Sequence, residues 1–104
     1  MIIIKEENTK AKREALKGYS IMVSNVDIHQ IIAFRFDNIK TGTEKQIAYA
    51  KSIMNNKVYK VNEITRNMMV GGKMTVKEYE KGIESLINEL DNFTDAKYII
   101  ENVK

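Results

Sequence analysis

The chain has 104 residues, of which 43% are hydrophobic and 30% charged; this fits one domain, residues 1–104, and excludes wholesale disorder. Cysteine is absent, which excludes disulfides and thiolate metal sites and fits a cytosolic protein. The net charge is +3, but residues 40–81 carry nine Lys and Arg against four Asp and Glu, whereas residues 82–104 carry two against five. A basic middle beside an acidic end can attract nucleic acid or an acidic protein surface.

The first part of the chain predicts a small sheet with one helix. Met1 to Lys5 is a β-branched run that favours a short strand. Asn8 or Thr9 can cap a helix that stops at Gly18. Tyr19, Ile21 and Val23 alternate with Ser20, Met22 and Ser24, which favours a strand, but a helical stripe through the same stretch leaves open a longer helix past Gly18.

Residues 28–37 show a clearer strand pattern with one mostly apolar face. The side chains expected on that inner face are Ile28, Gln30, Ile32, Phe34 and Phe36. A loop then leads to Gly42, where the helical half begins.

The stretch from Gly42 to Asn56 predicts an amphipathic helix with a defined start. Thr43 and Gln46 are spaced as a capping box, and Glu44 suits the positive end of the helix dipole. The apolar stripe consists of Ile47, Ala50, Ile53 and Met54. After Asn56 the stripe resumes as Val58, Val61, Ile64, Thr65 and Met68, so this part is either a second helix or a continuation bent at Asn55–Asn56.

Gly71–Gly72 ends that helical stretch, and two further helices follow. Thr75 with Glu78 forms a second capping box. The stripe behind it consists of Tyr79, Ile83, Leu86, Ile87 and Leu90. Thr94 is expected to cap a short terminal helix over residues 95–103. The fold class predicted is α+β: a small N-terminal β-sheet with one helix, then a mainly helical C-terminal half of three to four helices.

Two stretches resemble a signature of small proteins from phages, prophages and mobile elements. Their helix commonly reads Gly-Ser/Thr-Glu-Lys-Gln-Ile-x-Trp-Ala, which residues 42–50 resemble, and their tail reads like Ala-x-Phe/Trp-Trp-Ile-Asp-Asn-Arg, which residues 96–103 resemble. This chain has Tyr49 and Ile99 where the family favours Trp, and Val103 where it favours Arg. The family has no assigned enzymatic activity, so the resemblance implies a phage or mobile-element setting.

Catalytic and cofactor signatures are sparse. His29 is the only histidine, which gives a metal site or a catalytic triad little to build on. Gly71–Gly72–Lys73 departs from the phosphate-loop pattern, because Met74 stands where Ser or Thr is required. We therefore expect no enzymatic activity, no cofactor and no metal. We also expect neither a signal sequence nor a membrane span, and hence a place in the cytoplasm of a bacterial host.

The leading hypothesis is an accessory protein that binds a macromolecular partner, a protein or nucleoprotein, through its basic helical part. In a phage setting, such a partner includes host-defence proteins, as for anti-CRISPR inhibitors. The residues predicted to make this contact are Lys45, Lys51, Lys57, Lys60 and Arg66. One alternative is direct DNA or RNA binding, since Tyr49, Tyr59 and Tyr79 lie among the lysines. Another is a homodimeric structural module with an apolar seam on residues 75–91.

Overall fold

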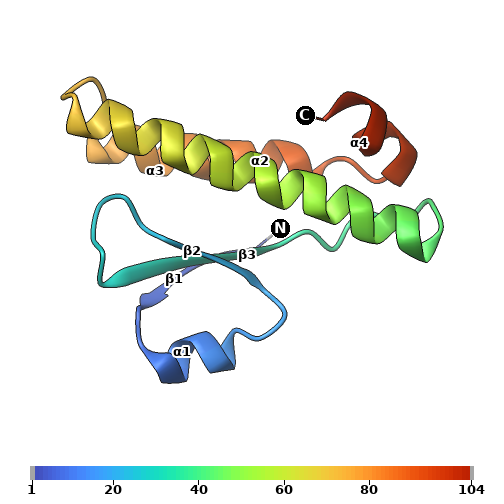
Figure 1. The fold of residues 1–104 in the computed structure, drawn as a ribbon, viewed down its shortest axis with the longest axis horizontal. Helices are drawn as coiled ribbons and strands as arrows, with labels where there is room; N and C mark the ends of the chain where they lie inside the picture. Colours follow the sequence, from blue (N-terminus) through green and yellow to red (C-terminus); the bar gives the residue numbers. More distant parts are fainter. Residues whose placement is uncertain (1, 104) are drawn as a thin grey trace.

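A computed structural model describes residues 2–103 and places a three-stranded antiparallel sheet at the N-terminal end (Figure 1). The strands are β1 (Ile2–Glu7), β2 (Ser20–Val23) and β3 (Gln30–Arg35), and helix α1 (Lys10–Ala15) connects the first two. The order in the sheet is β1-β3-β2, so β3 is central and both other strands are edges. β1 pairs with β3 in the register Ile4↔Ala33, and β2 pairs with β3 as Met22↔Ile32.

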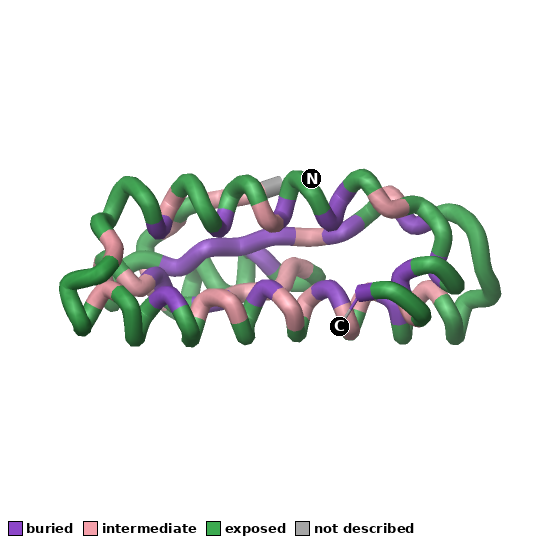
Figure 2. Tube along the Cα trace, turned by 90° about the horizontal axis from the view of Figure 1, so that it is seen from above, coloured by how far each residue is buried: buried purple, intermediate pink, exposed green. Residues whose placement is uncertain are grey.

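Three helices make up the rest of the described chain: α2 (Glu44–Val70), α3 (Val76–Asp91) and α4 (Ala96–Asn102). α2 has 27 residues, which at about 1.5 Å per residue is roughly 40 Å and matches the 41 Å long dimension of the molecule. α3 folds back beside α2, and α4 packs near the N-terminal half of α2 (Figures 1 and 2). The predicted class, α+β with a mainly helical second half, is therefore confirmed.

The sheet lies between two helical layers of unequal size. α2 and α3 cover one face, and α1 lies on the other (Figure 1). The main core lies between the sheet and the α2–α3 pair; its largest fully buried side chains include Tyr79, Phe34, Met54, Ile83 and Ile87. A smaller cluster of Leu16, Ile31 and Ala33 fills the space under α1.

Both capping boxes predicted from the sequence are confirmed. The Thr43 hydroxyl accepts from the Gln46 N–H at 3.1 Å, and the Gln46 side-chain oxygen accepts from the Thr43 N–H at 3.0 Å. Thr75 and Glu78 make the same reciprocal pair at the start of α3. Each box satisfies two of the amides that a helix start leaves unpaired.

The structure decides between two pairs of alternatives and corrects one expected helix cap. The chain turns at Gly18, whose φ of +94° ends any helical path, so the longer helix past it is wrong. The stretch from Asn56 to Val70 is not a separate helix, because α2 runs through Asn55 and Asn56 without interruption. Thr94 does not cap α4: Asp95 does, its carboxylate accepting from the Lys97 N–H at 3.0 Å.

The central strand is shorter than expected and differs in its environment. Ile28 lies outside β3 and is 72% exposed, although the alternation pattern placed it on an inner face. Within β3, Ile31, Ile32, Ala33 and Phe34 are all buried, since the helices cover both faces of the sheet. The alternation therefore identified the strand but not its two covered faces.

Candidate functional site

All five cationic residues predicted to contact a partner lie on α2, but they do not form one face. At about 100° per residue, Lys45 and Arg66 are roughly 60° apart around the helix axis, and Lys51 and Lys57 are roughly 120° apart. Lys51 and Lys57 are half-buried. Lys45, Lys60 and Arg66 are exposed. The structure brings together Lys57 and Lys60, and it separates them from Lys51 and Arg66.

Lys57 and Lys60 rim a groove between α2 and α4. The hollow has a volume of about 280 Å³. Its other lining residues are Tyr49, Ile53, Asn56, Ile100 and Val103. The groove therefore has a mostly apolar lining with two ammonium groups beside it, and among residues 2–103 no carboxylate side chain lines it. Each of the other two hollows described in the chain includes one, Glu63 or Glu89.

Backbone hydrogen bonds hold the two walls of the groove together. The Thr94 carbonyl accepts from the Lys40 N–H at 2.9 Å and from the Thr41 N–H at 3.1 Å, and the Thr41 carbonyl accepts from the Ala96 N–H at 2.9 Å. Ala96 and Ile99 anchor α4 in the main core. The segment before α2 and the start of α4 are thus fixed to each other, which sets the width of the groove.

Gly42 lies where the two stretches that resemble the phage-protein signature, residues 42–50 and 96–103, meet. Its φ is +135°, and a Cβ added to it would lie 2.9 Å from the Ala96 Cβ. A side chain would therefore be strained by the backbone and would collide with α4. The glycine that opens one stretch and the alanine that opens the other are in contact.

The tyrosines near the basic residues have three different environments. Tyr49 is 57% exposed on the groove, whereas Tyr79 is fully buried and cannot stack on a base. The Tyr59 ring packs edge-on against Phe34 at 5.8 Å. Tyr98, on α4, is half exposed, and its ring centroid lies 5.3 Å from that of Phe93.

A second hollow, of about 340 Å³, lies at the other end of α2 and contains Arg66. It lies between the segment after β2 and the C-terminal turns of α2. Its lining residues are Val23, Ser24, Asn25, Ile28, Asn62, Glu63, Arg66, Met69 and Val70. Val70 is 84% exposed, so this end of the molecule presents apolar side chains to solvent.

A polar network under this hollow joins β2 to both long helices. The Tyr79 hydroxyl donates to the Asn62 side-chain oxygen at 2.6 Å and accepts from the Asn25 N–H at 3.2 Å. The Asn25 side-chain amide donates to the same Asn62 oxygen at 3.0 Å and to the Asn62 carbonyl. Burial raises the pKa of Tyr79 above its usual value of 10.0, outweighing the hydrogen bonds from Asn25 and Ser24, which lower it.

The two long helices carry opposite charge. α2 holds five Lys and Arg against two Glu, a balance of +3, and α3 holds two Lys against five Asp and Glu, a balance of −3. The apolar stripe of α3 is buried inside the chain, with Tyr79 and Ile87 fully covered. The dimer seam expected on residues 75–91 is therefore not available at the surface.

Sequence reasoning missed the α4 side of the groove as a site. Ile100 and Val103 were seen only as part of a terminal helix, and nothing in the order of residues shows that they face Lys57. The sequence did contain one signal for the α2 side of the groove. Residues 49, 53, 56, 57 and 60 recur at intervals of three and four, which places them on one face of a helix.

The described residues contain no cluster of three or more His, Asp or Glu placed to hold a metal ion. Among the helices described, none combines the length and apolar character that crossing a membrane requires. Comparisons with protein-family models, curated proteins and solved structures found no match to this chain. The class defined by fold and site is thus a small α+β protein with a cation-rimmed apolar groove.

Proposed function

We propose that the chain is a non-enzymatic accessory protein of a phage or mobile element that binds a protein partner through the α2–α4 groove. The setting follows from the resemblance of residues 42–50 and 96–103, and it includes inhibition of host defence, as by anti-CRISPR proteins. The cytoplasm of a bacterial host is the compartment that goes with this setting.

One observation carries the proposal: an apolar groove between α2 and α4 with the exposed Lys60 at its rim. Aliphatic side chains such as Ile53 and Ile100 gain most from covering by other apolar groups. The Lys60 ammonium group adds attraction for carboxylates and orients the partner. An acidic, amphipathic surface of another protein matches both features.

The distribution of cations favours protein over nucleic acid as the partner at this groove. A nucleic-acid backbone is best followed by cations arranged along one line, and the five on α2 point around more than half of the helix. Tyr49 is the one ring in the groove lining that could stack on a base.

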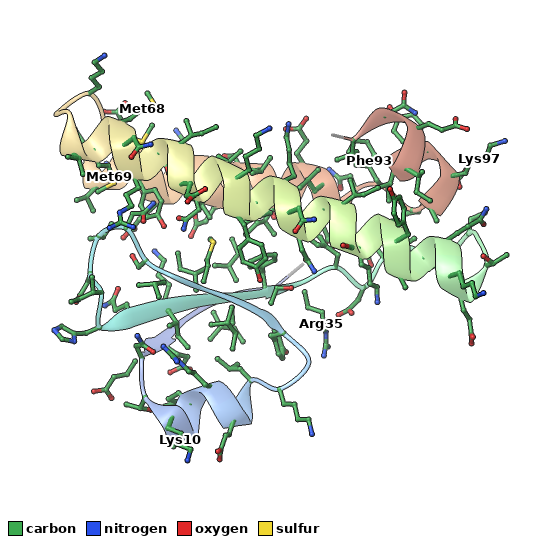
Figure 3. The ribbon with its side chains drawn as sticks, in the orientation of Figure 1. Lys10, Arg35, Met68, Met69, Phe93 and Lys97 are labelled. Carbon is green, nitrogen blue, oxygen red and sulfur yellow. The ribbon has the colours of Figure 1, made fainter. Side chains whose placement is uncertain are left out.

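The test compares Lys60→Glu with Lys10→Glu. Both change one exposed Lys to Glu, but Lys10 lies on α1, on the opposite face of the sheet (Figure 3). The immobilised protein is incubated with a lysate of a bacterium that carries CRISPR defence, each retained protein is purified, and its affinity for the three chains is measured. Lys60→Glu should weaken binding at least about tenfold through one reversed charge pair, and Lys10→Glu should leave it within about twofold.

Two results would count against the proposal. If no protein is retained from such lysates, the proposed protein partner does not exist there. Equal affinities for the wild-type chain and Lys60→Glu would show that the groove is not where the partner binds.

Direct nucleic-acid binding is a second candidate, favoured by a separate observation on α1. Lys10, Lys12, Arg13 and the nearby Lys17 are all exposed there, away from the groove. A gel shift with DNA and RNA at low and raised salt tests it, because phosphate contacts weaken steeply as salt rises. If this candidate is correct, Lys10→Glu should reduce the shift and Lys60→Glu should change it less.

A further inference from the structure

One edge of the sheet has unpaired backbone groups, and its hydrogen-bond pattern shows which ones. The Ser24 N–H donates to the Gln30 carbonyl at 3.0 Å, so Ser24 faces β3. Residues alternate along an antiparallel strand, and Met22 and Ser20 therefore face β3 as well. The N–H and C=O groups of Ile21 and Val23 then point to the free edge, where no partner is found among residues 2–103.

The opposite edge, β1, is protected in ways that β2 is not. Two ion pairs occupy its side chains: Lys5 with Glu80 at 2.9 Å, and Glu6 with Lys12 at 3.4 Å. In addition, the Glu7 carbonyl accepts from the Thr9 N–H. Charges on an edge strand discourage pairing with another chain. β2 reads Ser-Ile-Met-Val, without a charge or a proline, so it is the edge open to pairing.

α2 runs along the β2 side of the sheet. Its Asn62 is hydrogen-bonded to Asn25, the second residue after the strand, whereas β1 contacts α3 through Lys5 and Glu80. In Figure 1 β2 lies nearer the viewer than β1, with α2 above it and α1 below. An added strand would therefore lie under the outer flank of α2.

This arrangement disfavours a second copy of the chain as the occupant. Two paired strands lie about 4.8 Å apart, whereas packed helices need about 8–10 Å between their axes. A second copy paired through its own β2 would bring its own α2 over the same place. A bare extended segment brings no helix and fits.

The chemistry around the edge specifies the side chains of that segment. Around the axis of α2, Lys51 and Arg66 lie within about 40° of Asn62, whereas Glu63 is about 100° away. Glu63 still lines the hollow that Arg66 shares with Val23, so this flank carries two cations and one carboxylate and is net positive. On the other face, Ile21 contacts the cluster under α1, and Val23, two residues on, is 41% exposed.

We propose that β2 binds an extended segment of a partner protein, added to the three-stranded sheet as a fourth strand. The segment alternates acidic side chains, which face Arg66 and Lys51, with apolar side chains, which cover Val23. The two ends of α2 thus serve different contacts, and this inference does not depend on the α2–α4 groove.

The probe is a blocked nine-residue peptide that alternates valine and glutamate. Hydrogen exchange followed by NMR should show the Ile21 and Val23 amides protected only when the peptide is present, with Met22 and Ser24 protected throughout. A valine–lysine peptide should bind at least about tenfold more weakly because of Arg66 and Lys51. Two further peptides carry N-methyl groups on every second residue. Methylation of the amides that bond to β2 should abolish binding, and methylation of the residues between them should leave binding nearly unchanged.

Val23→Pro tests the protein side, with Val76→Pro as the matched control. Proline at 23 removes an N–H that points to the free edge and not one that bonds to β3. Position 76 is the first residue of α3, where proline is well tolerated, and its side chain is 47% exposed. Val23→Pro should weaken peptide binding at least about tenfold, and Val76→Pro should not change it. Retained protection of Met22 shows that the sheet has folded.

Four results would overturn the proposal. The first is no binding of the valine–glutamate peptide up to its solubility limit. The second is equal binding of the two N-methylated peptides, and the third is equal loss of binding in the two proline variants. The fourth is a particle of twice 12.0 kDa with Ile21 and Val23 already protected, because a second copy would then occupy the edge.

Discussion

Gly42 has the least freedom to change among the glycines of this chain, because both its backbone and its surroundings exclude a side chain. Its φ of +135° is unfavourable for any L-residue, and the Ala96 Cβ lies 2.9 Å from the position that its own Cβ would take. Gly82 differs on both counts: it lies within α3 and faces open space.

The pair gives opposite predictions for one type of substitution. Gly42→Ala should lower the free energy of unfolding by about 1–3 kcal/mol through backbone strain and the close approach to Ala96. Gly82→Ala should raise it by about 0.5–1 kcal/mol, since alanine is the better helix former. Urea denaturation of the three proteins measures both. A destabilised Gly82→Ala, or an unaffected Gly42→Ala, would contradict the packing described.

Tyr79 gives a prediction about pH. Its pKa is raised by burial, so the folded state holds the phenol proton more tightly than the unfolded state does. The corresponding stability is fully present below the unfolded pKa, about 10, and is lost as pH rises through the higher folded pKa. The free energy of unfolding should therefore fall above about pH 10. Tyr79→Phe should be less stable at pH 7 by about 1–2 kcal/mol and show a shallower fall.

Denaturation at pH 8, 9, 10 and 11 gives the slope of the free energy of unfolding against pH for the wild-type chain and for Tyr79→Phe. Identical slopes in the wild-type chain and Tyr79→Phe would mean that the phenol is not protected from ionisation.

At the level of elements, the start of α2 depends on its capping box. Thr43→Ala removes the hydroxyl that accepts from the Gln46 N–H and should cost about 1 kcal/mol. For a domain of this size that is a fall in melting temperature of at least about 4 °C. Ser52→Ala, at an exposed site inside the same helix, should not lower it. Equal melting temperatures for Thr43→Ala and the wild-type chain would mean that the cap contributes nothing.

Local signals in the sequence predicted most elements, because caps and apolar stripes depend on residues close in the chain. Thr43, Thr75 and the stripe of α3 are of this kind. The bend considered at Asn55–Asn56 could not be decided, since asparagine is tolerated inside a helix that is packed along its length. The choice of Thr94 as a cap was wrong because its carbonyl is engaged by Lys40 and Thr41, a contact between distant parts of the chain.

The candidate site was predicted only in part, for the same reason. The cations of α2 could be read from the sequence, and their spread around the axis follows from their numbering. That Ile100 and Val103 complete a groove with Lys57 and Lys60 depends on the docking of α4. The free groups of Ile21 and Val23 depend on the order of strands, which the alternation pattern does not contain.

At the scale of the whole molecule, the two sides of the sheet differ in how firmly they are held. The face under α2 and α3 carries the main core, whereas none of the residues of α1 itself is buried, and the cluster beneath it consists of Leu16, Ile31 and Ala33. Little buried apolar surface is therefore exposed to solvent when α1 opens.

We expect α1 to open separately from the rest of the chain. Its amides should exchange with solvent through local opening, at a free energy well below that of global unfolding, whereas those of Met54 and Val58 in α2 should exchange only on global unfolding. Native-state hydrogen exchange at increasing urea separates the two groups by their dependence on denaturant. Equal protection of α1 and the middle of α2 would mean that the molecule opens as one unit.

The opposite charges of α2 and α3 have a consequence for how this molecule meets others. The two helices lie side by side with balances of +3 and −3, so the chain has an electric dipole across its width that its net charge of +3 does not reveal. An approaching anionic body would rotate the molecule to present α2 before the surfaces touch. Encounter rates should then depend on ionic strength more than the lifetime of the complex does, since steering acts during approach.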